Sequence, residues 1–185
     1  MITLTITVLT LFATVFSNSK SPKCNSPLGV SDGSLKDSHL KASSSYSPAV
    51  GAHNGRLGTE RGGGAWCPKN LVSPEREEWL EVNLGSEMLV TGVMVQGRYA
   101  RGQGQEYVEF VKILTWHKKK EWKEESNKAG EVVIKANTDT FSKEKILLEK
   151  GVRTTRLRIM PISDHPRMIC LRVEILGCQL KGMYH

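Results

Sequence analysis

The positions of the four cysteines constrain the fold of this chain more than any other feature. Cys24 lies near the start of the chain, Cys178 near its end, and Cys67 and Cys170 lie between them. No two of them are two to four residues apart and no histidine pair accompanies them, so the spacing does not suit a zinc site. Structural disulfides fit better, and four cysteines allow three pairings. We therefore expect one closed domain that folds where thiols oxidise.

The first 17 residues predict a secretory signal peptide. They are apolar, fall short of the roughly 20 residues that span a bilayer, and are followed by small residues suited to cleavage. A membrane anchor or a buried first strand is the alternative, because the charged start of a typical signal is missing. The expected organisation is a signal peptide over 1–17, a short segment over 18–23, a domain over 24–178 and a tail over 179–185.

The net charge of +7 and the pI near 9.3 favour anionic partners. Heparan sulfate and anionic phospholipid fit a secreted protein, whereas nucleic acid is not expected. The densest basic cluster is Lys118, Lys119 and Lys120, at the tip of a predicted hairpin. It is either a solvated turn or a heparin contact.

Strand patterns dominate from residue 79 onward, and helix signals are weak. Most of these runs alternate apolar and polar residues, which indicates strands with one buried face. The expected strands are 79–84, 88–95, 108–116, 156–160 and 170–178. Residues 32–72 lack this periodicity and are expected to form short strands and protruding loops. Short strands separated by glycine-rich and charged turns predict an all-β sandwich or jelly roll.

The sequence contains no pattern typical of an active site. Its five histidines are scattered without metal-ligand spacing, and no Gly-x-Ser-x-Gly elbow is present. We therefore predict a binding protein rather than an enzyme, with no cofactor and no metal.

Six segments resemble, in order, the coagulation-factor C-type or discoidin domain. They are 42–47, 64–68, 79–84, 95–98, 156–161 and 170–178. Within that family the sequence is most similar to the collagen-binding domain of the discoidin domain receptors. The resemblance implies an eight-stranded jelly-roll barrel or sandwich closed by disulfides. It also implies the pairs Cys24–Cys178 and Cys67–Cys170.

The same resemblance implies a collagen trench among loops at one end of the barrel. Arg98 and Glu106 match the family's ion pair, and Tyr46 takes the place of its tryptophan. Three positions depart from the family pattern, where an aspartate, a threonine and an asparagine are expected. These positions are Gly63, Val50 and Met168. The trench is therefore expected to be more apolar than in the receptors. Trp66, beside a cysteine, is expected to be a core residue.

Three classes of ligand follow from these observations. The first is collagen or another extracellular matrix protein, bound through the loops. The second is an anionic phospholipid surface, for which Tyr46 and Val50 are modest membrane contacts. The third is a glycan, either heparin at the lysine tip or a sugar near His53 and Arg56.

Overall fold

The computed structural model describes residues 24–117 and 120–180. The predicted signal peptide, the segment 18–23 and most of the predicted tail lie outside these residues. So do Lys118 and Lys119. No helix in the described part of the chain is long and apolar enough to cross a membrane.

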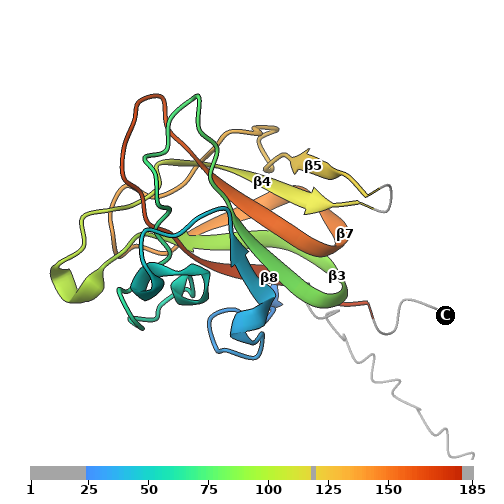
Figure 1. The fold of residues 1–185 in the computed structure, drawn as a ribbon. Helices are drawn as coiled ribbons and strands as arrows, with labels where there is room; N and C mark the ends of the chain where they lie inside the picture. The colour runs from blue at the N-terminus through green and yellow to red at the C-terminus, as the bar shows by residue number, and fades with distance from the viewer. Residues whose placement is uncertain (1–23, 118–119, 181–185) are drawn as a thin grey trace, which may run out of the picture.

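Strands carry the fold, and the helical elements of the described residues are short 3-10 turns (Figure 1). The strands are β1 (Ser26–Pro27), β2 (Leu40–Ala42), β3 (Leu80–Gln96), β4 (Phe110–Trp116), β5 (Trp122–Glu125), β6 (Ile134–Lys135), β7 (Glu144–Ile162) and β8 (Arg172–Gln179). The turns are η1 (Asp37–His39), η2 (Pro48–Val50), η3 (Ala52–Asn54) and η4 (Ala100–Gly102). The prediction of an all-β fold is confirmed.

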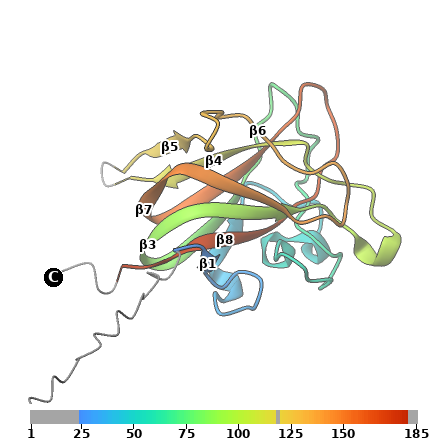
Figure 2. The same cartoon turned by 180° about the vertical axis from the view of Figure 1, so that it is seen from behind.

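All eight strands belong to one antiparallel sheet in the order β1-β8-β3-β7-β4-β5, with β2 added to β3 and β6 to β4. The pairings do not close the sheet into a complete ring. Register shifts interrupt β3 between Asn83 and Met88 and between Val90 and Gly92. Such irregularities bend a strand, and the long strands curve around the core. The long loops gather at the end of the sheet away from the β4–β5 tip (Figures 1 and 2).

The predicted strands are present, and two of them differ from the structure by more than two residues. Segments 79–84 and 88–95 are parts of the single strand β3, which continues through Gly85 at a φ of 76°. Strand β7 begins at Glu144, twelve residues before the predicted 156–160 (156 − 144 = 12). Residues 144–155 are mostly polar or charged, so the strand forms there because β3 pairs with it and not because of a local pattern.

Strand β8 is buried on both faces, although its alternating sequence is typical of a half-exposed strand. Arg172 and Glu174 lie on the face that the alternation assigns to solvent, yet each is only 1% exposed. Loops cover that face: the Glu174 carboxylate accepts hydrogen bonds from the backbone N–H groups of Val30 and Ser31. Gly55 and Leu57 pair with the backbone of Val173.

The main core lies on the other side of the sheet. Trp66 is fully buried there, as expected, and its indole N–H donates to the Ser44 carbonyl at 2.9 Å. The largest apolar side chains around it are Leu80, Ile113, Leu157, Ile159, Ile169, Leu171 and Ile175.

Two disulfides close the domain, in the pairing that the resemblance implied. Cys24–Cys178 joins residues 154 positions apart, and Cys67–Cys170 joins residues 103 positions apart. The first ties the chain before β1 to the end of β8. The second ties the loop region to the segment just before β8.

Replacing Cys24 and Cys178 together with serine is expected to lower the free energy of unfolding by about 2–5 kcal/mol. The cross-link restricts the unfolded chain over 154 positions, and this restriction is lost in the variant. Urea denaturation followed by tryptophan fluorescence measures the change. The variant keeps Cys67–Cys170 and the core, so its near-ultraviolet circular dichroism should remain that of a folded protein. An unchanged midpoint and slope would contradict the prediction.

Candidate functional site

The residues that the sequence assigns to a trench line one cavity at the loop end of the molecule. The cavity has a volume of about 460 Å³. Its wall is formed by Tyr46, Val50, Gly63, Arg98, Glu106 and Met168, together with Ser47, Ala49, Cys67 and Cys170. The fold thus brings together four loop segments that are far apart in the sequence.

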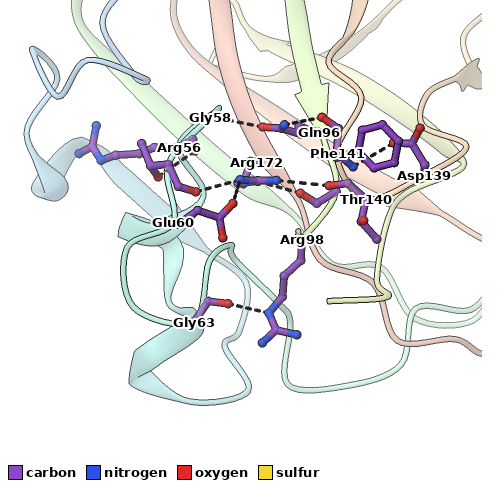
Figure 3. A network of polar contacts seen from close by, with 12 residues as sticks. Arg56, Gly58, Glu60, Gly63, Gln96, Arg98, Asp139, Thr140, Phe141 and Arg172 are labelled. Carbon is purple, nitrogen blue, oxygen red and sulfur yellow. Dashed lines mark hydrogen bonds and ion pairs between the residues drawn. The ribbon is translucent and has the colours of Figure 1, made fainter. Parts of the chain in front are cut away.

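Arg98 and Glu106 form an ion pair in this wall. The Arg98 Nη1 lies 3.0 Å from the Glu106 Oε2. The Arg98 Nε donates to the Gly63 carbonyl at 2.6 Å, as Figure 3 shows. The side chains are 23% and 29% exposed, so a ligand can reach both. Burial raises the pKa of the Glu106 carboxyl, but hydrogen bonds from Arg98 and from the Gln105 backbone outweigh it and leave the pKa lowered. The Glu106 carboxylate is therefore ionised at neutral pH.

A buried arginine that the sequence analysis did not single out holds the loops around this pair. Arg172 donates to the carbonyls of Gly97, Thr59 and Thr140 at 2.7, 2.9 and 3.3 Å, and to the Glu60 carboxylate at 2.6 Å (Figure 3). Burial lowers the pKa of its guanidinium, and the charge of Glu60 opposes that shift. Gly97 directly precedes Arg98 in the chain. The hydrogen bond from Arg172 to the Gly97 carbonyl therefore fixes the position of the Arg98 backbone.

The Cys67–Cys170 disulfide fixes the opposite wall. The Cys67 carbonyl accepts a hydrogen bond from the Tyr46 N–H, and the Cys67 N–H donates to the Val50 carbonyl, both at 3.0 Å. Tyr46 is 67% exposed and Val50 only 8%. The aromatic ring therefore stands free at the rim of the cavity, while the valine helps to form its floor.

Val50 and Gly63, where the resemblance implies a threonine and an aspartate, are in contact with each other. The Gly63 N–H donates to the Ala49 carbonyl at 2.6 Å. A Cβ at Gly63 would lie 2.5 Å from the Val50 Cγ1 and 3.1 Å from the Ala49 carbonyl oxygen. The two loops are thus closer together than a side chain at position 63 permits.

The resulting site is an apolar hollow with one charge pair on its wall. Val50, Met168 and the disulfide supply the apolar surface, and Tyr46 supplies an aromatic face. Such a hollow suits an apolar side chain of a ligand, while Arg98 is placed to donate hydrogen bonds to a ligand carbonyl or carboxylate.

The structure also reveals an exposed aromatic pair at the loop end. Tyr99 and Phe141 are 43% and 60% exposed, and their rings meet edge to face with centroids 6.5 Å apart. Arg101 and Lys143 are exposed beside them in the sequence. The two aromatic residues come from separate loops, so no local pattern indicates the pair.

The other candidate residues lie elsewhere. Of the predicted heparin contacts, only Lys120 is described, and it is exposed near the β4–β5 tip. Arg56 is 2% exposed and donates to the Val30 carbonyl and to Asp37, so it faces the interior and not a glycan. Within the described residues, no group of three or more histidine, cysteine or acidic side chains is arranged to hold a metal ion.

Comparison with known proteins identifies the family. The F5/8 type C domain family matches residues 38–175, and the chain belongs to this family of discoidin domains. It is 33% identical over 181 residues to the discoidin domain-containing receptor A of Caenorhabditis elegans, covering 96% of this chain and 24% of the receptor. It is 35% identical over 161 residues to lactadherin of Mus musculus, covering 84% of this chain and 34% of lactadherin. The chain thus spans a minor part of the length of both relatives.

A solved structure supports the same fold. Discoidin II of Dictyostelium discoideum superposes with a TM-score of 0.66 at 21% identity, covering 89% of this chain and 62% of that one. At this level of identity the likeness concerns the fold alone.

Replacing Gly63 with aspartate is expected to lower the free energy of unfolding by about 1–3 kcal/mol, as overpacking does. The new Cβ would overlap the Val50 side chain. The double variant Val50→Ala/Gly63→Asp should cost less than the sum of its single variants, because the same contact is relieved. Urea denaturation of the wild type and the three variants completes the cycle. Additive costs would show that the two positions are not in contact.

Proposed function

We propose that this discoidin domain is an extracellular recognition module that binds collagen or another matrix protein through the loop-end cavity. The observation that carries the proposal is the convergence of six residues from four loop segments, with Arg98 and Glu106 paired at 3.0 Å. Two disulfides and the resemblance to receptor domains favour an extracellular location, reached through the predicted signal peptide.

The chemistry of the cavity suits a matrix protein segment. An imino-acid-rich chain presents apolar rings and backbone carbonyls that its own hydrogen bonds leave free. The rings fit the apolar floor and the face of Tyr46, and the carbonyls fit the N–H donors of Arg98. The fixed loops lower the entropy cost of ordering the site on binding.

Tyr46→Ala is expected to weaken binding to native fibrillar collagen by at least about tenfold, because tyrosine is enriched among the residues that dominate binding energy. Solid-phase binding of the oxidised chain measures this, with heat-denatured collagen as the control ligand. Phe141→Ala is the matched control, since it removes an aromatic of 60% exposure that lies outside the cavity lining. The double variant Arg98→Ala/Glu106→Ala should also lose binding while remaining folded.

Two results would contradict the collagen proposal. One is the absence of saturable binding to native collagen by the wild type. The other is an equal loss for Tyr46→Ala and Phe141→Ala, which would place the contact at the loop end in general and not in the cavity.

The second candidate function is binding to an anionic phospholipid surface, and the Tyr99–Phe141 pair favours it. Two exposed aromatic side chains flanked by Arg101 and Lys143 suit the boundary between headgroups and acyl chains. The sequence relation to lactadherin is compatible with a shared site of this kind, which we offer as a proposal for this chain.

Under the phospholipid proposal, Phe141→Ala lowers binding to phosphatidylserine-containing vesicles severalfold, whereas Tyr46→Ala has a smaller effect. The difference arises because Phe141 and Tyr99 insert together. Vesicle co-sedimentation at low and physiological salt measures it, with phosphatidylcholine vesicles as the control. Equal binding to both types of vesicle, or the same effect for both variants, would rule out this use of the aromatic pair.

A further inference from the structure

Three of the four tryptophans of the chain contact Arg156 and Arg158 of β7, whose side chains point away from the main core, whereas Leu157 between them is fully buried. On β4 the buried residues Val111, Ile113 and Thr115 alternate with Trp116 and its outward neighbours. We call this outward cluster the Trp–Arg face. It consists of Trp79, Trp116, Trp122, Arg156 and Arg158.

The arginines of the Trp–Arg face are stacked on the indole rings. The Arg158 guanidinium carbon lies 3.8 Å from the ring centroid of Trp79 and 4.2 Å from that of Trp122. Arg156 lies 4.2 Å from the ring of Trp116, which meets Trp122 edge to face at 5.1 Å. Cation–π stacking on both sides holds a guanidinium plane in place and leaves its N–H edges available.

One carboxylate serves both arginines. Glu81 accepts a hydrogen bond from the Arg158 Nε at 2.9 Å and lies 3.6 Å from the Arg156 Nη1. Among the described residues these are the only ion pairs of the two guanidinium groups. Arg156 and Arg158 are still 33% and 24% exposed. The face therefore keeps an excess positive charge and free, rigidly held N–H donors.

One further cation extends this charge along the sheet. Lys41 is exposed and lies opposite Glu81 on β3, on the same face as the two arginines. Lys123 on β5 lies opposite the buried Thr115 and therefore belongs to the other face. Lys112, by contrast, is paired with Glu124 at 2.8 Å. The positive groups of this face thus extend across three neighbouring strands, from Lys41 on β2 past β3 to Arg156 and Arg158 on β7.

We propose that the Trp–Arg face binds a sulfated glycosaminoglycan chain. A linear polymer with anionic groups on successive sugars matches a line of cations, and guanidinium forks match sulfate and carboxylate groups. The indole edges offer apolar surface to the sugar rings between them. This site is separate from the cavity proposed for a matrix protein and does not depend on it.

Heparin is the probe for this proposal, and the intact oxidised chain is the protein. Arg158→Gln is expected to raise the heparin Kd about tenfold, because it removes a charge-assisted donor pair. Arg158→Lys should weaken binding as well, since lysine keeps the charge but lacks the planar guanidinium group.

Arg101→Gln is the matched control: it removes the same charge at the opposite, loop end of the molecule and should change Kd less than twofold. Isothermal titration at two salt concentrations measures all three.

The outcomes distinguish a specific site on this face from general attraction between heparin and a basic protein. Equal losses for Arg101→Gln and Arg158→Gln would mean attraction by net charge alone and would overturn the proposal. An unchanged heparin Kd for Arg158→Lys would show that the stacked guanidinium group of Arg158 is not needed for binding. Equal competition by polyglutamate would assign the face to an acidic peptide instead.

Arg98→Ala should leave heparin binding unchanged. That result would support a heparin site distinct from the cavity, whether or not the cavity binds collagen. If Arg158→Gln fails to fold by circular dichroism, Arg156→Gln replaces it with the same expectation.

Discussion

The buried guanidinium of Arg172 is the interaction on which the loop end depends. A charge that is only 1% exposed is costly unless it is paired and hydrogen-bonded, and here three backbone carbonyls and Glu60 surround it. Those partners lie in three loops that have no periodic secondary structure of their own. Because the buried guanidinium group must keep its hydrogen bonds, Arg172 holds these three loops in place. Removing Glu60 would leave that charge without its carboxylate and weaken all three loops together.

The cavity lies between two such fixed points. On one side, Arg172 holds Gly97 and thereby the start of the Arg98 side chain. On the other side, the Cys67–Cys170 disulfide holds the backbone of Tyr46 and Val50. The walls are thus held by covalent and charged contacts, together with the close packing of Gly63 against Val50 within the lining.

The sequence predicts the strand within 108–116 well, because buried residues alternate there with partly exposed ones. It fails for the first part of β7, because residues 144–155 take their conformation from pairing with β3. It also misjudges β8, since alternation cannot show that loops cover Arg172 and Glu174. The cavity residues were found through family resemblance alone. The Tyr99–Phe141 pair and the Trp–Arg face arise from residues on separate segments, so no local pattern contains them.

The two proposed sites differ in their electrostatics, and this difference decides how they would act together. In the cavity, Arg98 and Glu106 neutralise each other, so binding there depends on shape and hydrogen bonds and is weakly affected by salt. On the Trp–Arg face, two guanidinium groups share one carboxylate, so binding is electrostatic and weakens with salt. Extracellular matrix holds proteins and sulfated glycans side by side. A rigid domain that contacts both at once gains from the effective concentration of the second ligand, without any coupling between its sites.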